Sequence, residues 1–550
     1  MSSMLRKLLK PNKFNLSHQN ALSLRLGDLV PLMVEHLNPG EPFNIKGFFD
    51  ARFAPMQAPM MSHVDFKTWA FAVPYRLVWE DYEKFFTGVN EKGDKVSPTF
   101  PRLTFGSSDE TSLIEPYLAT RLFGPGSLSD YLDLNNYSDA PNDTRDEFLE
   151  RMVNLPDQSM LEPRAYQLIY NECFRDQNID APVEFDIDSR VYCESANQRD
   201  EEEVRNLLTI RQKRWEKDYF TSALPTPTMA DDVAIPVDAN VNFVGGDSQL
   251  VIEDDGTAIF TPGLSSGTDG SLKASTGSGY LDAYLDPNGT LRAQDNAASI
   301  RDLTYSKAIY QFLLDSALGG RVRIKDFYRT MFNTTLPDYR AMIPEYIGGG
   351  TQPVIVSEVV QTSETNETSQ GNLSGRAVSV GKGHRYYYKA TEHTIIMVLG
   401  CFIPKPSYGS GLPKRHFKFD RFDYYLPHFD HVGDQEIKRK ELVVTGDPSV
   451  NEETYGYAPR FAEYKSAVSR VHGKFRGSLA YWTMARLFDP TEPPRLNSLF
   501  ITPDESVLNR PFFVQSNGEL TPPDEHVYLE CNFVVKAWRP MSKNSHPMVM

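Results

Sequence analysis

Long apolar runs are missing from this 550-residue chain. No window reaches the roughly 18 consecutive apolar residues that a membrane-spanning helix requires, and the best candidate is the short run Thr394–Phe402. The amino terminus, MSSMLRKLLKPNKF, has neither an uninterrupted apolar segment nor a small-residue cleavage site. These absences predict a protein that is not inserted in a membrane, carries no secretion signal and folds in a cytoplasm.

Cysteine is also scarce. The four cysteines, Cys173, Cys193, Cys401 and Cys531, are widely separated and form no C-x-x-C pair. This spacing argues against a zinc knuckle and against a disulfide framework, although an even number keeps disulfides formally possible. We expect buried thiols, and we predict no metal and no cofactor.

Positive charge is in short supply, because the net charge is −16 and the isoelectric point about 5.3. That is the wrong sign for a protein whose whole surface grips nucleic acid. The excess of negative charge is concentrated between Asp231 and Asn296, which contains eleven acidic residues and only two basic ones, Lys273 and Arg292. Since this stretch is rich in Gly and Ser, we expect residues 231–298 to be a loop-rich insertion on a surface remote from phosphates.

The two ends of the chain are basic. No acidic residue precedes Asp28, and none follows Glu530. The candidate nucleic-acid contacts are Arg6, Lys7, Lys10, Lys13 and Arg25 in an amino-terminal arm (1–27), and Lys536, Arg539 and Lys543 in a carboxy-terminal segment (525–550). These side chains could equally be solvated or bridge neighbouring subunits.

The chain does have ample core material, with 40% hydrophobic and 12% aromatic residues. Residues 527–538 alternate apolar and polar side chains, and this period of two predicts a strand. Further strands are expected at 43–53, 66–73, 353–363 and 393–403. Early and late strands that pair across long separations are typical of an antiparallel jelly roll.

Helices are expected between these strands at 77–86, 164–176, 300–318 and 324–332. In the second, Tyr166, Ile169, Tyr170 and Cys173 recur at helical spacing and form one apolar face. Residues 88–163 are interpreted as a loop and helix insertion. There is no internal repeat or flexible linker, so one structural unit is expected.

Catalytic motifs are weak. Gly263–Gly267 fits the G-x-S-x-G pattern of a hydrolase but lies in Gly/Ser-rich text without the required strand and helix, so no catalytic residue is predicted. Gly348–Gly350 and Gly381–Gly383 lack the remaining residues of a phosphate-binding loop, and turns explain them better.

Two other clusters have alternative interpretations. His428, Asp430, His431 and Asp434 resemble a metal-ligand set, but Pro427 and Gly433 predict a loop, which favours surface or intersubunit hydrogen bonds. The aromatic runs 386–388 and 417–425 could stack single-stranded bases, and subunit interfaces are the favoured interpretation.

Several longer motifs carry a family resemblance. They are FAVPYRLVWEDYEKFF at 71–86, RAYQLIYNECFRDQN at 164–178, KRWEKDYFTSALP at 213–225, PEYIGGG at 344–350 and FRGSLAYWTMARLF at 475–488. In these motifs the chain resembles the major capsid protein of the Microviridae, small single-stranded DNA bacteriophages, and the gokushovirus-like branch in particular.

The resemblance implies a single eight-stranded jelly-roll barrel with long insertions, sixty copies of which build an icosahedral shell through pentamers around a circular single-stranded DNA genome. It also implies an internal scaffolding protein, a minor pilot protein and a host cell-surface receptor, with assembly in the bacterial cytoplasm. Because sixty copies of a chain with charge −16 cannot neutralise a genome, a small basic DNA-condensing protein is expected as well.

A competing interpretation is a secreted β-sandwich that binds or hydrolyses glycans. Trp69, Trp79 and Trp482 would then line a sugar groove, and a carboxylate pair should flank it. No such pair stands out in the sequence.

Overall fold

The computed structural model describes residues 11–90, 92–104, 122–134, 157–192, 198–227, 333–360, 373–430, 433–512 and 525–541, with shorter pieces between them. The chain divides into two compact units rather than the expected single one. Residues 1–228 and 320–550 form the larger unit, and residues 229–319, which contain the whole acidic stretch, form the other.

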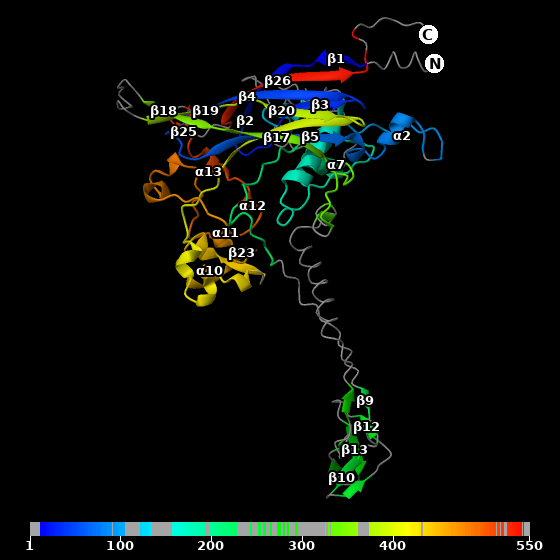
Figure 1. Ribbon diagram of the computed structural model, residues 1–550, viewed down its shortest axis with the longest axis vertical. Helices are drawn as coiled ribbons and strands as arrows, with labels where there is room; N and C mark the ends of the chain where they lie inside the picture. Colours follow the sequence, from blue (N-terminus) through cyan, green and yellow to red (C-terminus); the bar gives the residue numbers. More distant parts are fainter. Residues whose placement is uncertain are drawn as a thin grey trace. The chain divides into compact units, whose positions relative to one another are not determined.

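Two antiparallel sheets organise the larger unit (Figure 1). The seven-stranded sheet has the order β1-β26-β4-β19-β18, with β2 also paired to β26 and β20 to β4. Its strands are β1 (Asn12–Asn15), β2 (His18–Leu24), β4 (Pro42–Phe53), β18 (Ile355–Val360), β19 (Leu373–Val380), β20 (His384–Lys389) and β26 (Val527–Arg539). The four-stranded sheet has the order β17-β5-β21-β3 and consists of β3 (Val30–Leu37), β5 (Val64–Pro74), β17 (Glu345–Pro353) and β21 (Thr394–Pro404).

The inner faces of the two sheets share one apolar core. Phe49 and Phe533 of the larger sheet contact each other at a ring separation of 5.8 Å, and Phe49 lies 5.3 Å from Phe66 of the smaller sheet. Phe66 in turn stacks on Phe402 at 4.3 Å. The alternation predicted at 527–538 is confirmed, because every second residue of β26 from Val527 to Ala537 is buried.

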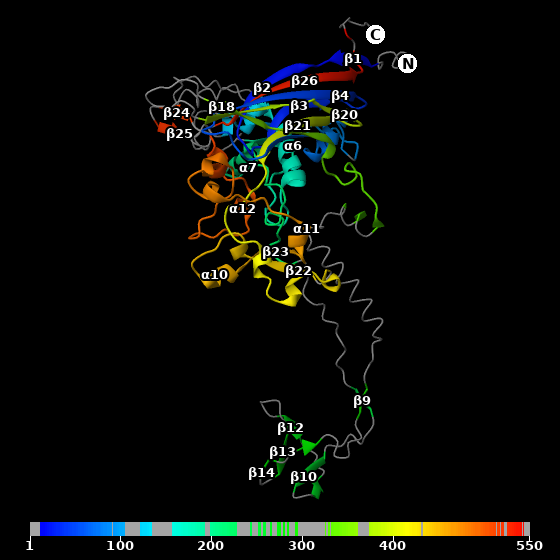
Figure 2. The same ribbon diagram turned by 60° about the vertical axis from the view of Figure 1, so that its left-hand side comes forward.

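Helices cover the outer face of the four-stranded sheet (Figure 2). Helix α6 (Leu161–Ile169) continues as a π-helical turn, η3 (Tyr170–Phe174), which confirms the predicted helix at 164–176 in its main part. Tyr166 and Ile169 pack there against strand residues such as Met397. All eleven residues of β21 are buried because the strand has the core on one face and this helix on the other.

The expected helix at 77–86 is wrong in its first half. The chain forms a short 3-10 turn, η1 (Tyr75–Leu77), and then α2 (Tyr82–Thr87), with non-helical residues between them. The carbonyl of Val78 accepts a hydrogen bond from the Arg164 guanidinium at 3.0 Å, and the Trp79 side chain is fully buried. These tertiary contacts hold residues 78–81 away from a regular helix.

The prediction of a turn at 348–350 is also wrong, since this glycine run lies inside β17 and pairs with β5. A Cβ atom on Gly349 would lie 2.7 Å from the Thr68 carbonyl oxygen, and one on Gly350 would overlap the His384 ring. Glycine is therefore required by the close approach of neighbouring strands. Residues 381–383 do form the turn between β19 and β20, as predicted.

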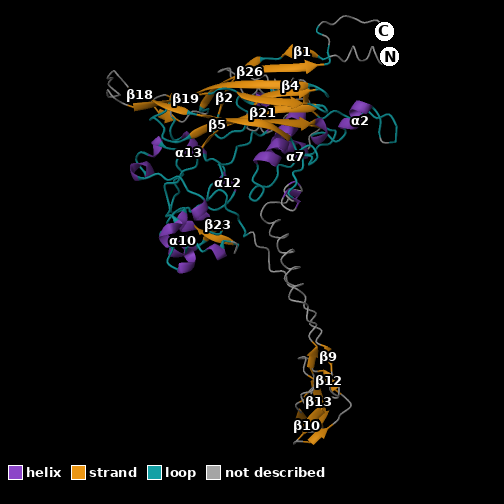
Figure 3. Ribbon diagram, in the orientation of Figure 1, coloured by secondary structure: helices purple, strands orange, loops and turns teal. Residues whose placement is uncertain are grey.

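The long connections contain the remaining elements of the larger unit (Figure 3). The strands are β6 (Arg102–Leu103), β7 (Gln158–Ser159), β8 (Val191–Tyr192), β22 (Asp434–Lys438), β23 (Thr454–Pro459), β24 (Val514–Ser516) and β25 (Glu519–Thr521). The α-helices are α4 (Leu128–Tyr131), α7 (Gln198–Leu208), α10 (Pro448–Glu452), α11 (Ala462–Lys465), α12 (Ser498–Ile501) and α13 (Glu505–Asn509). Six 3-10 turns are η4 (Lys414–Phe417), η5 (Arg421–Asp423), η6 (Pro427–Phe429), η7 (Arg439–Glu441), η8 (Gly473–Arg476) and η9 (Ala480–Trp482).

The second unit has short antiparallel strands in its described parts. They are β9 (Asn242–Val244), β10 (Val251–Asp254), β11 (Thr257–Ile259), β12 (Leu264–Ser266), β13 (Leu272–Thr276), β14 (Gly279–Tyr280), β15 (Ala283–Tyr284) and β16 (Arg292–Gln294). The helix expected at 300–318 lies outside the described residues, whereas residues 325, 328, 329 and 332 of the next one are helical.

Predicted strands at 43–53, 66–73 and 393–403 are confirmed by β4, β5 and β21. The one at 353–363 corresponds to β18, and residues 361–363 are not described. Cys401 and Cys531 are buried thiols as expected. Cys173 is exposed, and it lies in the π-helical turn η3, where the α-helical spacing that predicted it on the apolar face no longer holds. Cys193 is outside the described residues.

Candidate assembly and nucleic-acid surfaces

The two basic ends meet on one edge of the seven-stranded sheet. Strand β1 pairs with the end of β26 so that Lys13 lies opposite Trp538 and Asn15 opposite Lys536. Lys13, Lys536 and Lys543 are exposed. Arg6, Lys7 and Lys10 lie outside the described residues. The structure therefore brings together Lys13 and Lys536, which are more than 500 residues apart in sequence.

Two of the predicted nucleic-acid contacts, Arg539 and Arg25, interact with acidic residues of this chain instead. Arg539 forms an ion pair with Glu41, whose side chain is fully buried, and lies 4.0 Å from Glu35. Arg25 lies 3.8 Å from Glu505 at an exposed position. Because a buried carboxylate needs its cation, Arg539 has a structural task that does not depend on nucleic acid.

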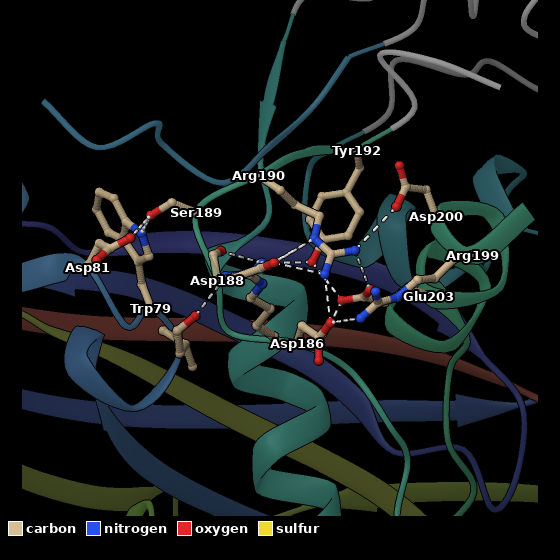
Figure 4. Close-up of polar contacts among 12 residues, drawn as sticks. Trp79, Asp81, Asp186, Asp188, Ser189, Arg190, Tyr192, Arg199, Asp200 and Glu203 are labelled. Carbon is tan, nitrogen blue, oxygen red and sulfur yellow. Dashed lines mark hydrogen bonds and ion pairs between the residues drawn. The ribbon is translucent and has the colours of Figure 1, made fainter. Parts of the chain in front are cut away.

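A charged cluster around Arg190 was not predicted from the sequence (Figure 4). Its guanidinium contacts four carboxylates, at 2.6 Å from Asp186, 2.8 Å from Asp188, 3.2 Å from Asp200 and 3.0 Å from Glu203. Hydrogen bonding to Asp188 is the main cause that raises the pKa of Arg190. The dense acids of EFDIDSR and RDEEE around two arginines were the signal that could have revealed it.

Neighbouring side chains connect this cluster to the core. Arg164, which is fully buried, donates a hydrogen bond to the Tyr192 hydroxyl at 2.7 Å, and that hydroxyl donates to Glu203 at 2.9 Å. The Trp79 indole donates to Ser189 at 2.8 Å (Figure 4). Burial raises the pKa of Tyr192 well above its usual value, so the phenol stays protonated. The arrangement fixes α6, α7 and the segment between them, and every acid is satisfied by a cation or a donor.

The aromatic run 417–425 forms an exposed surface. Phe419 is 89% exposed, and Phe422, Tyr424 and Tyr425 are each about half exposed. The loop is nonetheless ordered by hydrogen bonds, since the backbone N–H groups of Phe419 and Asp420 both donate to Asp423. Exposed aromatic groups on a fixed loop are typical of a protein contact surface.

A hollow of about 460 Å³ lies beside this loop. Tyr424, Tyr464 and Val468 line its apolar side, and Lys418 forms a 2.6 Å ion pair with Glu463 at its wall. Burial raises the pKa of Glu441, which accepts a hydrogen bond from Tyr219 at 3.0 Å. These charged groups are already paired within the chain.

The structure does not turn the histidine and aspartate cluster at 428–434 or the G-x-S-x-G motif at 263–267 into a metal or catalytic site in the described residues. Asp430 accepts a hydrogen bond from Lys465 at 2.8 Å, His428 lies in η6, and His431 is outside the described residues. Within the described part of the chain no group of three or more His, Cys, Asp or Glu residues could hold a metal ion. Ser265 lies in β12 and not in the loop that was expected.

A two-sheet β architecture with exposed aromatic side chains on the 417–425 loop is typical of a protein that contacts other chains. Sequence comparisons give the class a name. The family model for the capsid protein (F protein) matches residues 3–117 and 147–549. The chain belongs to this phage capsid protein family, and the resemblance to major capsid proteins of the Microviridae is confirmed.

Three curated relatives are similar over nearly their whole length. Capsid protein VP1 of Bdellovibrio phage phiMH2K is 28% identical over 531 residues, which cover 92% of each chain. Capsid protein VP1 of Chlamydia phage 1 is 27% identical, over 92% of this chain and 91% of the relative. Capsid protein VP1 of Spiroplasma virus 4 is 26% identical, over 98% and 95%.

This family is structural, so the chain is a component of the virus particle. The glycan-protein interpretation is set aside on that ground, and Trp79 lies in the core instead of in a groove. No helix in the described residues is long and apolar enough to cross a bilayer.

Proposed function

We propose that this capsid protein is built on a single eight-stranded jelly roll whose copies close into an icosahedral shell. The supporting observation is the strand order. Strands β2, β26, β4 and β20 follow one another in one sheet, and β3, β21, β5 and β17 in the other. Each sheet thus alternates early and late strands of the chain, which is the pattern of a jelly roll.

In this proposal the remaining segments are excursions from the barrel. Residues 88–163 are an insertion that extends the shell wall, residues 1–27 are an arm, and residues 525–550 supply the last strand and a basic tail. The shell contains sixty copies arranged as pentamers under closed symmetry, and the exposed aromatic loop at Phe419 contacts a neighbouring copy.

The shell encloses a circular single-stranded DNA genome in the bacterial cytoplasm. The basic ends face this genome, and Lys13 and Lys536 are the described residues that favour the idea, because both are exposed on one pair of strands. With a charge of −16 per copy, the shell needs a small basic DNA-condensing protein as a companion. An internal scaffolding protein and a minor pilot protein complete the assembly.

The acidic stretch 231–298 projects outward and contributes to host attachment through a cell-surface receptor. It belongs to a compact unit separate from the sheets, and phosphates would repel its carboxylates. Deleting residues 231–298 in an infectious clone is expected to leave particles that form but no longer attach to cells. Deleted particles that attach normally would contradict this role.

The assembly proposal is tested by electron microscopy of the expressed full chain. Symmetric shells, or pentamers that close into shells when the scaffolding protein is added, are the expected result. A chain that stays monomeric under both conditions would refute the proposal.

The genome-facing arm is tested by replacing Arg6, Lys7, Lys10 and Lys13 with Ala. We expect shells of normal number that retain less DNA, because each lost cation removes one phosphate contact. The ratio of absorbance at 260 and 280 nm of purified particles measures retention. A matched variant that exchanges each Arg for Lys and each Lys for Arg keeps the charge and should package normally.

A further inference from the structure

The outer face of the seven-stranded sheet carries a row of cations across four strands. Register places the side chains on one face: Arg385 of β20 lies opposite Lys46 of β4, and Lys46 opposite Val534 of β26. One step along the strands, Tyr387 lies opposite Asn44, and Asn44 opposite Lys536. Because facing residues in a sheet point to the same side, these groups share one surface.

This surface continues onto the neighbouring positions. Lys389 lies two residues beyond Tyr387 on the same strand face, and Lys13 of β1 lies opposite Trp538 of β26. The five cations of this row are Lys13, Lys46, Arg385, Lys389 and Lys536. None of the five takes part in an ion pair among the described residues, unlike Arg190, Arg539 or Lys418.

Aromatic rings lie between these cations. Tyr387 is 62% exposed although its neighbour Tyr386 is buried in the core. The Lys46 ammonium lies 4.1 Å from the Phe48 ring centroid, and the Lys13 ammonium 5.9 Å from that of Trp538. Rings set among cations on the open face of a sheet provide stacking positions for bases and contacts for phosphates.

Acidic residues of the same face are confined to its other end. Asp50 of β4 lies opposite Glu530 of β26, and Gln19 donates a hydrogen bond to Glu530 at 2.7 Å. The helices α6 and α7 lie on the side of the four-stranded sheet, so the described helices leave this face uncovered (Figures 1 and 2). The positive field is therefore local to the row from Lys389 to Lys13.

We propose that this basic and aromatic face binds single-stranded DNA, with bases stacked on Tyr387 and Trp538 and phosphates held by Lys46, Arg385 and Lys536. The inference rests on the proposed enclosure of a single-stranded genome and gives it a docking surface beyond the basic ends. A single strand suits the face because unpaired bases expose the rings that stacking requires.

The test measures binding of the purified full chain to a fluorescein-labelled oligothymidylate by anisotropy at several salt concentrations. Replacing both Lys46 and Arg385 with Ala should lower the slope of log affinity against log salt by about 1.4, since each lost phosphate contact contributes about 0.7 for single strands. Lys95→Ala removes an exposed cation far along the chain from this face and should leave the slope unchanged.

Stacking is tested separately at Tyr387. Tyr387→Ala should weaken binding about 5-fold to 100-fold while leaving the salt slope unchanged, because a ring and no charge is lost. Tyr387→Phe keeps the ring and should bind as the wild type does. If Tyr387 had only a structural role, its replacement would change the melting temperature, and the Ala and Phe variants would bind the oligonucleotide equally well.

The inference is overturned if the Lys46 and Arg385 double variant keeps the wild-type slope, or if Tyr387→Ala binds as tightly as Tyr387→Phe. Electron microscopy of the same preparations separates this result from failure of the proposed function. Wild-type chains that stay monomeric with and without the scaffolding protein refute the shell. Wild-type chains that assemble with that protein, but that bind the oligonucleotide before assembly no better than the variants do, refute only the docking face.

Discussion

The interior between the two sheets and the charged cluster around Arg190 stabilise the same unit by opposite means. Phe402 is fully buried against Phe66 and Phe53, and its contacts are apolar and without strict direction. Arg190 is also largely buried, but it depends on four carboxylates within 3.2 Å. An apolar core tolerates a change of shape better than an ionic cluster tolerates the loss of one member.

The largest effect is expected in the apolar interior. Phe402→Ala removes a ring that touches both sheets and should lower the free energy of unfolding by about 4 kcal/mol. Phe402→Leu retains most of the volume and should cost less than half as much. Chemical denaturation of the purified chain measures both, and equal losses would mean that the cavity is not the cause.

The charged cluster should be nearly as sensitive. Arg190→Ala leaves Glu203 and Asp200 in a largely buried site without their cation, and a loss of about 3 kcal/mol is expected. Arg190→Lys keeps the charge but cannot reach four carboxylates, so it should fall between the wild type and Arg190→Ala. If Lys behaves as Arg does, charge alone suffices and the geometry of the guanidinium is unimportant.

Asp28, a buried carboxylate that forms no ion pair among the described residues, gives a second comparison with the Arg190 cluster. Burial raises the pKa of Asp28 from its usual 3.8 to about 7, opposed by Arg25 and by a hydrogen bond from Gln212. The folded state then binds the proton more tightly than the unfolded state, so stability is present at low pH and is lost as pH rises from about 4 to 7.

Asp28→Asn should remove this pH dependence. Between pH 5 and 7.5 the melting temperature of the wild type should fall by roughly 2–4 °C relative to that of the variant, the smallest of these effects. Thermal denaturation at the two pH values checks the difference. Parallel curves would mean that Asp28 is ionised in the folded protein at both pH values.

Strands that bury one face were predictable from their residues. The period of two at Val527–Trp538 identified β26, and the apolar run at Thr394–Phe402 identified β21. The helix at Tyr166 was recognised for the same reason, since one apolar face must be covered. Strands β2 and β3 were not foreseen, because neither His18–Leu24 nor Val30–Leu37 shows a clear period of two.

Features set by contacts between distant segments were not predictable. Gly349 lies in a strand beside the Thr68 carbonyl, which leaves no room for a side chain. No residue near Gly349 in the sequence indicates that neighbour. The four partners of Arg190 and the pairing of Arg539 with Glu41 depend on the fold in the same way. The row of cations from Lys389 to Lys13 emerges from register across four strands, which no single segment displays.

The place of β26 has a consequence for how the molecule is made. This strand comes last among the described strands along the chain, yet it separates β2 from β4 in the middle of its sheet. Until the ribosome has delivered it, both neighbours expose unpaired backbone groups. A prematurely terminated copy would therefore lack a strand inside one sheet, and we expect such a copy not to fold into a subunit that can assemble.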